Sequence, residues 1–409
     1  MRKSTAFGCT AALALATLAG CAGAEPPGEA GSESGDRPTP SPAEPDSTES
    51  RSDPSDDSDD SAREPVGPPP TPRVREAVAE DISTPWGMVF LEDDSALVSE
   101  RNTGRILRVM RSGQVREVGT VPEVAEPPSY GEGGLLGIEF ADDTLYAYRT
   151  VDGENQVVAM DYDPDRRGGR SGLGEPRVLL AGIPQDDFHN AGRIVFGPDD
   201  YLYVATGDGR EPENAQDLDS LGGKILRVTP EGDPAPGNPF DDSPVWSYGH
   251  RNIEGLAFDG AGRLWASEFG EDARDELNLI EPGENYGWPE VEGMGDDGDY
   301  RNPVHVWPVE EASPAGLAYA DGALWMAALR GERLWRIDLD PNADRDAAAP
   351  TRGEPKAFLT EEYGRLRTVE RAPDGSLWLS TSNTDGRDSS VGVGENDDRI
   401  LRVRLTDAE

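Results

Sequence analysis

The side chain best suited to proton transfer in this chain is His189, one of three histidines among 409 residues. It lies in the segment Asp187–Arg193, directly before an apolar stretch, and the next apolar stretch ends at Gly207–Gly209. If the two stretches pair as a hairpin, the chain returns to its starting edge and Asp208 lies beside His189. A histidine with a carboxylate partner has a fixed tautomer and is a common general base. Such a pair also occurs as a purely structural contact, so the surrounding motifs decide between the two interpretations.

Two arginines, Arg365 and Arg367, are separated by one residue, so a strand would present both guanidinium groups on the same face. Taken alone, such a pair is typical of a solvated sheet edge, so its role depends on the motifs around it. Three further polar motifs follow one another along the chain at Tyr248–Asn252, Asp275–Ile280 and Asn285–Pro289. We expect His250 to hold the residues that follow it, and His305 has no accompanying motif.

A repeated pattern predicts the elements that position these residues. Each copy consists of a short apolar strand, a turn rich in Asp and Gly, and a second strand with aromatic residues at alternate positions. A repeat of roughly 40 to 50 residues is the signature of propeller blades, and no long stretch has the 3.6-residue period of a helical solenoid. The sequence therefore predicts an all-β, six-bladed β-propeller. The copies begin near Pro85, Gly134, Gly192, Gly255, Gly316 and Leu366.

Several copies continue into a third strand, for example at Arg105–Val109 and Lys224–Val228, and the last strand, Arg399–Val403, is expected to close the ring. The longest insertions, Thr206–Trp246 and Phe269–Val304, are rich in Gly, Asp and Asn, and we expect them to form loops. Loops of this length in a compact fold are usually functional or disordered. Because the propeller scaffold serves both enzymes and binding proteins, the function has to be inferred from these loops.

The first part of the chain predicts export. Residues 1–20 combine a basic start, an apolar stretch and small residues before Cys21, which is typical of a bacterial lipoprotein signal peptide. Residues 21–72 are rich in Pro, Ser, Asp and Glu, so we expect a disordered acidic tether, followed by the propeller domain at residues 73–409. The membrane would be contacted only through a lipid on Cys21, and the protein would face the extracellular or periplasmic side.

The net charge narrows the possible binding partners, and the positions of the cysteines decide whether the propeller can contain a disulfide bond. With a formal net charge of -42, nucleic acid is not an expected partner, because binding phosphates needs a basic face. The many carboxylates would suit Ca²⁺. Both cysteines, Cys9 and Cys21, lie in the leader, so the propeller contains no disulfide bond.

In their order and spacing, the motifs resemble those of the soluble aldose sugar dehydrogenases that depend on pyrroloquinoline quinone (PQQ), also called glucose/sorbosone dehydrogenases. The resemblance extends from about Pro85 to Val403. It implies an oxidoreductase that oxidises the anomeric C1 hydroxyl of aldose sugars to lactones, with hydride transfer to PQQ. His189 would remove the hydroxyl proton, Asp208 would orient His189, and Arg251 would stabilise charge on the quinone oxygen.

The same resemblance implies two cofactors, PQQ and Ca²⁺. An active-site calcium would be held by backbone carbonyls around Gly270 and Glu271, and a structural calcium near Glu276 and Tyr286. Glu132 replaces a glutamine found in some members, and its carboxylate would repel an anionic cofactor unless calcium or Arg365 lies nearby. The residues implied to bind PQQ are Glu132, Arg251, Asn252, Arg330, Arg365 and Arg367.

Two alternatives remain open at this point. The first is a non-enzymatic extracellular propeller that binds glycans or proteins through its loops. The second is a calcium propeller that hydrolyses lactones. No motif identifies the sugar, the electron acceptor or the oligomeric state.

Overall fold

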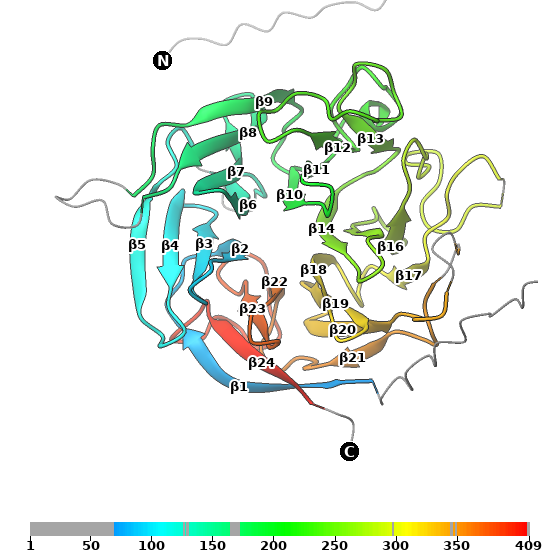
Figure 1. Cartoon of the computed structure of the whole chain (residues 1–409). Coiled ribbons are helices and arrows are strands. Elements are labelled where there is room, and N and C mark those ends of the chain that lie inside the picture. Colours follow the sequence, from blue (N-terminus) through cyan, green and yellow to red (C-terminus); the bar gives the residue numbers. More distant parts are fainter. Residues whose placement is uncertain are drawn as a thin grey trace, which may run out of the picture. The chain divides into compact units, whose positions relative to one another are not determined.

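Six four-stranded antiparallel sheets are arranged around a common axis in the computed structural model (Figure 1). It describes residues 69–406 except 126, 128–130, 164–171, 297, 344–346 and 348–349. The predicted six-bladed β-propeller is thereby confirmed. The predicted signal peptide and nearly all of the predicted tether lie outside the described residues. None of the helical segments in the described ranges is long and apolar enough to span a membrane.

The first three blades follow one another along the chain, and each runs from the axis outwards. Blade 3 also carries the short 3-10 helix η1 (Pro212–Ala215) between its second and third strands. The strands of these three blades are β2 (Pro85–Phe90), β3 (Ala96–Glu100), β4 (Arg105–Val109) and β5 (Val115–Thr120) in blade 1, β6 (Leu135–Ala141), β7 (Thr144–Val151), β8 (Glu154–Asp161) and β9 (Arg177–Ile183) in blade 2, and β10 (Ala191–Phe196), β11 (Leu202–Thr206), β12 (Lys224–Val228) and β13 (Val245–Tyr248) in blade 3.

The other three blades complete the ring, and the last of them takes its outer strand from the start of the domain. Their strands are β14 (Ile253–Phe258), β15 (Leu264–Glu268), β16 (Arg274–Ile280) and β17 (His305–Pro308) in blade 4, β18 (Pro314–Ala320), β19 (Ala323–Ala328), β20 (Arg333–Asp338) and β21 (Lys356–Phe358) in blade 5, and β22 (Leu366–Arg371), β23 (Leu377–Thr381), β24 (Ile400–Thr406) and β1 (Thr71–Ala79) in blade 6.

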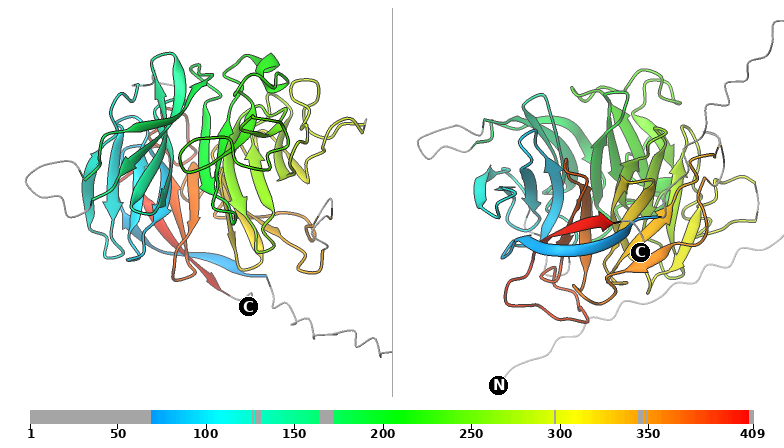
Figure 2. Two further views of the ribbon diagram at one scale, coloured as in Figure 1. Left: turned by 45° about the horizontal axis from the view of Figure 1, so that its top comes forward. Right: turned by 60° about the horizontal axis from the view of Figure 1, so that its bottom comes forward.

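Strand β1 closes the ring by pairing antiparallel with β24, from Thr71 opposite Thr406 to Ala79 opposite Ile400. Figure 2 shows the two strands side by side, β1 in blue and β24 in red. The predicted final strand therefore does belong to the closing blade, but the strand at its edge comes from the other end of the domain. As a result, the propeller begins before residue 73, the boundary that the composition had suggested.

The prediction that Phe269–Val304 forms only loops is wrong, because this segment contains β16. Its sequence, RDELNLI, lacks an apolar pattern, yet all residues after Arg274 are buried. The polar side chains are satisfied by hydrogen bonds inside the protein, for example from Asn278 Nδ2 to Glu276 at 3.0 Å. In the same way, Thr206–Trp246 contains η1 and β12 as well as loops.

The apolar core of the described residues forms six clusters, each between two successive blades. The second strand of each blade contributes to two of them, because it is covered on both faces; β11, for example, is buried along its whole length. This burial explains the apolar and aromatic residues of the repeated pattern, and Trp265 and Trp325 are fully enclosed. The blades are therefore held together mainly by apolar packing between neighbouring sheets.

The recurring glycine of the first strand has a steric cause. A Cβ atom on Gly137 would lie 2.2 Å from the carbonyl oxygen of Gly192 in the next blade, and one on Gly255 would lie 2.4 Å from that of Ala315. The inner strands approach each other closely around the axis, so only glycine fits at these positions. This close packing fixes the start of each inner strand, where the candidate site lies.

Candidate active site

A cavity of about 660 Å³ lies at the end of the ring where the inner strands begin. Loops from several blades supply its walls, so residues that are far apart in the sequence meet there. It contains seven of the residues predicted to take part in chemistry or cofactor binding. These are Glu132, His189, Arg251, Gly270, Arg330, Arg365 and Arg367.

His189 and Asp208 come together as the hairpin argument predicted. His189 precedes β10 and Asp208 follows β11, and Nδ1 of His189 lies 2.7 Å from Oδ1 of Asp208. The close approach requires Gly207, because a Cβ atom there would lie 1.9 Å from the carbonyl oxygen of His189. With the Nδ1 proton directed at the carboxylate, Nε2 is left as the basic nitrogen of a neutral imidazole.

The carboxylate of Asp208 is fully buried and its oxygens are occupied by donors. The indole N–H of Trp288 donates to Oδ2 at 2.9 Å, and the backbone N–H of Arg210 donates to Oδ1 at 2.7 Å. These bonds hold the carboxylate in place behind His189, which is 17% exposed. Trp288 was part of a predicted motif, but its role in holding Asp208 was not recognised from the sequence.

Arg251 reaches the cavity between two supporting groups. Its backbone N–H donates to the buried Glu268, and its guanidinium lies over the ring of Trp288, 5.3 Å from the centroid. The Nε atom is buried and has no hydrogen-bond partner among the described residues. A buried donor without an acceptor is costly, so the site is suited to a ligand that brings an acceptor.

Asn252 does not line the cavity, although it was predicted to bind the cofactor. Its side chain is fully buried behind the wall, where Oδ1 accepts the backbone N–H of Ala191 at 2.9 Å and Nδ2 donates to Glu254 at 3.2 Å. Both ends of the amide are therefore used inside the protein. The position of Asn252 fits a role in fixing the segment that follows His189.

Arg365 and Arg367 both face the cavity, as their spacing predicted, but neither is a solvated edge residue. Nε and Nη2 of Arg365 donate to Asp385 at 3.0 and 2.9 Å, and Nη1 of Arg367 donates to Glu254 at 2.6 Å. Burial lowers the pKa of Arg365 from its usual value, and Asp385 opposes the shift. Nε of Arg367 is buried without a partner in the described structure. Within the same residues, Arg330 forms no ion pair.

Glu132 is close to the cavity but is already neutralised. Its Oε1 accepts a hydrogen bond from Nη2 of Arg387 at 2.9 Å, and its Oε2 accepts the backbone N–H of His189 at 2.9 Å. The sequence had suggested calcium or Arg365 as the compensating cation. Arg387, which the sequence analysis did not single out, takes this place.

The four residues predicted to hold calcium are not gathered in one place by their side chains. Gly270 lines the cavity, but Glu271 is exposed, and its backbone N–H donates to Oε1 of Glu292 at 2.8 Å. In the part of the chain that the structure describes, no group of three or more His, Cys, Asp or Glu side chains is arranged to hold a metal ion. Calcium at the cavity would therefore depend on backbone oxygens.

Glu276 and Tyr286 lie away from this cavity. Oε1 of Glu276 accepts the N–H of Gly293 at 2.7 Å, and burial next to Glu268 raises the pKa of Glu276 to about 8. The hydroxyl of Tyr286 donates to the carbonyl of Leu279 at 2.7 Å, so a ligand role there is left to its backbone. Asn278 donates from Nδ2 to both glutamates, and its Oδ1 is buried without a partner among the described residues, which suits a cation at this second position.

The two remaining histidines are structural. Nδ1 of His250 lies 3.0 Å from Glu268, Nε2 lies 2.9 Å from Ser247, and the ring stacks on Tyr286. His250 thus supports the segment that carries Arg251, in agreement with the prediction. His305 contacts Thr351 at 3.1 Å and lies outside the site.

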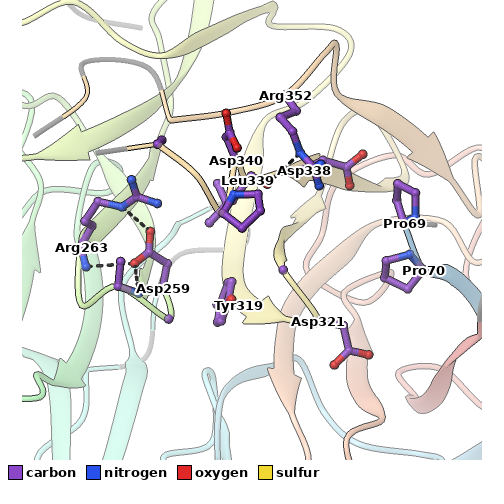
Figure 3. Close-up of a pocket in the computed structure, with 15 residues that line it drawn as sticks. Pro69, Pro70, Asp259, Arg263, Tyr319, Asp321, Asp338, Leu339, Asp340 and Arg352 are labelled. Carbon is purple, nitrogen blue, oxygen red and sulfur yellow. Dashed lines mark hydrogen bonds and ion pairs between the residues drawn. The ribbon is translucent and has the colours of Figure 1, made fainter. Parts of the chain in front are cut away.

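A second cavity, of about 520 Å³, lies at the opposite end of the ring, beside the turns after β14 and β18 (Figure 3). Asp259 accepts hydrogen bonds from Nε of Arg263 at 2.7 Å and from the indole of Trp265 at 2.9 Å, and Asp338 pairs with Arg336 at 2.8 Å. Among the described residues that line this cavity there is no histidine and none of the predicted site residues. It offers no counterpart of the pair formed by a general base and its orienting carboxylate.

Comparison with known proteins agrees with the geometry. The sequence profile of the glucose/sorbosone dehydrogenase family matches residues 82–392. The chain belongs to this family. It is therefore an oxidoreductase, and the alternative of a non-enzymatic binding propeller is not supported.

Individual relatives carry related names. Quinoprotein glucose dehydrogenase B of Acinetobacter calcoaceticus is 35% identical over 262 residues, which cover 55% of this chain and 54% of that protein. Aldose sugar dehydrogenase YliI of Escherichia coli is 28% identical over 76% of this chain and 90% of its own length. The PQQ-bound aldose sugar dehydrogenase of Streptomyces coelicolor has a sequence that is 50% identical. Its structure matches with a TM-score of 0.76, and the match covers 83% of this chain and all of that chain.

Proposed function

We propose that the protein is a PQQ-dependent aldose dehydrogenase that oxidises the anomeric C1 hydroxyl of a sugar to a lactone. The observation that carries the proposal is the arrangement around one cavity: His189, with its buried partner Asp208, faces the same space as five arginines. The PQQ-bound relative at 50% identity supports the choice of cofactor. The sugar and the electron acceptor are not specified by the residues of the site.

The cavity suits an anionic cofactor with several carboxylates. Arg330 forms no ion pair within the described residues, and the Nε atoms of Arg251 and Arg367 are buried without partners there. These donors would hold the carboxylates and the quinone oxygens of PQQ. When bound, PQQ supplies the two-electron acceptor for the hydride that leaves C1 of the sugar.

The residues of the protein account for the proton. Nε2 of His189 takes the proton of the anomeric hydroxyl while the hydride leaves C1, so the sugar loses two electrons and both hydrogens and becomes the lactone. Asp208 stabilises the imidazolium that forms, because its carboxylate is buried and already aligned with Nδ1. Arg251 is placed to stabilise negative charge on an acceptor oxygen in the cavity.

Calcium is part of the proposal. Backbone carbonyls near Gly270 would bring the ion to the edge of the cavity, where it would polarise a cofactor oxygen. A second ion would be held near Glu276 and the backbone of Tyr286, next to Oδ1 of Asn278, which has no hydrogen-bond partner in the part of the chain that the structure describes. Export as a lipoprotein through Cys21 is likewise a proposal, because it rests on the leader sequence alone.

The test uses a chain that begins at residue 69, purified without cofactor. PQQ and Ca²⁺ are added singly and together, and reduction of a dye acceptor is followed with a panel of aldoses. We expect turnover only when both are present, with lactone as the product. Absence of PQQ binding in the presence of Ca²⁺ would overturn the proposal.

A further inference from the structure

Glu132 contacts the backbone of the histidine segment, whereas Asp208 contacts the imidazole ring. Its backbone N–H donates to the carbonyl of Asp187 at 2.8 Å, and its Oε2 accepts the backbone N–H of His189 at 2.9 Å. The two bonds lie on either side of Phe188. His189 has a φ of 60°, a conformation that costs energy for a residue with a side chain. Glu132 therefore helps to keep His189 in this unfavourable conformation.

The second oxygen of Glu132 connects this segment to blade 6. Oε1 accepts Nη2 of Arg387 at 2.9 Å, and the backbone N–H of Arg387 donates to Asp385 at 3.0 Å. Asp385 in turn receives the guanidinium of Arg365. A continuous path of hydrogen bonds therefore runs from the backbone of His189 through Glu132 and the loop between β23 and β24 to an arginine of the cavity.

Arg387 is also in contact with the histidine segment directly. Its guanidinium lies 5.6 Å from the ring of Phe188, and Arg210 lies at the same distance from that ring. The side chains of Arg387 and Glu132 are 35% and 16% exposed, so water screens their charges only in part. Arg387 forms the ion pair of Glu132 within the described residues, and Arg101 is a further cation in its surroundings, so without Arg387 the negative charge of Glu132 in the cavity wall would be only partly compensated.

We propose that Glu132 and Arg387 form a charge-compensated positioning pair for the reaction. This inference rests on the proposed function. Glu132 fixes the backbone of His189, and Arg387 cancels the charge of Glu132 so that a tricarboxylate cofactor can bind beside it. Arg387 also couples the loop between β23 and β24 to the histidine. Neither residue exchanges a proton with the substrate.

The pair predicts a specific pattern of cofactor affinity in four proteins: the wild type, Glu132→Gln, Arg387→Met and the double variant. Arg387→Met leaves a carboxylate facing the cofactor, so the Kd for PQQ measured with Ca²⁺ rises at least tenfold. Glu132→Gln leaves Arg387 positive, so the Kd stays the same or falls. In the double variant both charges are gone, and the Kd returns to within about threefold of the wild-type value.

A second comparison separates the backbone contact from the charge. Glutamine keeps an oxygen that can accept the N–H of His189, whereas alanine does not. At saturating PQQ and sugar, kcat therefore falls at least tenfold in Glu132→Ala and changes less than threefold in Glu132→Gln, while KM for the sugar changes less than kcat. A loss of kcat in Glu132→Gln as large as that in Glu132→Ala would overturn the backbone role.

Arg210→Met is the matched control, because Arg210 lies at the same distance from Phe188 but pairs with Asp186 rather than Glu132. Its PQQ affinity should equal that of the wild type, and thermal unfolding verifies that all variants are folded.

If Arg387→Met weakens PQQ binding by the same factor in the wild type and in the Glu132→Gln variant, the effects of the two substitutions are additive. The pair is then refuted, although the proposed function stands. If the wild type binds no PQQ, the proposed function and the electrostatic role of Arg387 both fail.

Discussion

Asp208 and His189 are 19 residues apart, and their side chains meet at 2.7 Å because β10 and β11 form a hairpin that brings its two ends together. The carboxylate is fully buried and the imidazole is partly open to the cavity. A buried charge with fixed donors needs little reorganisation when the neighbouring histidine becomes positive. The pair is thus arranged to favour proton uptake at Nε2, on the side of the cavity.

Replacing the general base tests this assignment most directly. We expect His189→Ala to lower kcat by roughly 10²- to 10⁴-fold, the usual contribution of general-base catalysis. PQQ affinity should change little, because the arginines that would hold the cofactor are untouched. His305→Ala is the control, since His305 lies outside the cavity and contacts Thr351. Dye reduction and PQQ titration measure the two effects, and near-normal turnover in His189→Ala would rule out the mechanism.

Asp208→Asn should impair the base without removing it. If the oxygen of the new amide keeps the indole of Trp288, its NH₂ group turns towards His189 and the backbone N–H of Arg210 loses its acceptor. The amide then donates to Nδ1, and the neutral imidazole carries its proton on Nε2, where it cannot accept another. We expect kcat to fall about 100-fold or more, with a smaller change in KM. An unchanged kcat would show that Asp208 does not control the tautomer.

Two arginines of the cavity should respond differently to replacement by alanine. Arg330 forms no ion pair within the described residues, so Arg330→Ala should weaken PQQ binding at least tenfold and leave the melting temperature unchanged. Arg365 is bound to the buried Asp385, so Arg365→Ala leaves an unpaired carboxylate inside the protein and costs roughly 3 kcal/mol of stability or more. PQQ titration and thermal unfolding distinguish them. Equal melting temperatures of the two variants would contradict this assignment.

Two glutamates near the axis predict how stability depends on pH. Burial raises the pKa of Glu139 to about 7 and that of Glu370 to about 8, and Arg193 opposes both shifts. The folded state then binds more protons than the unfolded state between about pH 4.5 and 8. This contribution to stability is present at the acidic end of that window and is lost as the pH rises through it.

We therefore expect the melting temperature to fall less between pH 5 and pH 8 in Glu370→Gln than in the wild type. Each unit of difference between the folded and unfolded pKa corresponds to about 1.4 kcal/mol of free energy of unfolding. The exposed Glu92→Gln serves as the control and should follow the wild-type curve. Thermal unfolding at several pH values measures both. If the melting temperature of Glu370→Gln fell with pH as steeply as that of the wild type, the Glu370 carboxyl would not titrate between pH 5 and pH 8.

The sequence predicted the inner part of the propeller better than its outer part. Second strands such as β11 are covered on both faces, so they appear as recurring apolar runs. Outer strands such as β9 are largely exposed and lack that pattern. Strand β1 lies next to a proline-rich segment and has polar residues at its exposed positions, so composition alone placed the domain boundary too late.

In the candidate site, a contact within one hairpin could be predicted from the sequence, whereas contacts between residues far apart in the sequence could not. The hairpin made the contact of His189 with Asp208 predictable, because both residues belong to one pair of strands. Glu132 and Arg387 are 255 residues apart and meet only because blade 6 returns to the start of the ring. No local spacing indicates such a contact, and the same holds for Glu254 and Arg367, which are 113 residues apart.

The closing strand can be tested by truncation. A chain that begins at residue 80 lacks β1, so β24 loses its outer partner and the apolar contacts of Val78 and Ala79. We expect a clearly lower melting temperature than for a chain that begins at residue 69. Adding a peptide of residues 69–79 should restore part of the difference. Identical unfolding curves would show that β1 is dispensable.

The pairing of Thr71 with Thr406 also sets an order of events for the growing chain. The first strand of the domain has no partner until β24 has been synthesised, so the ring cannot close before then. Contacts between such distant residues form slowly. Until they form, the edge of β1 that faces β24 stays unpaired.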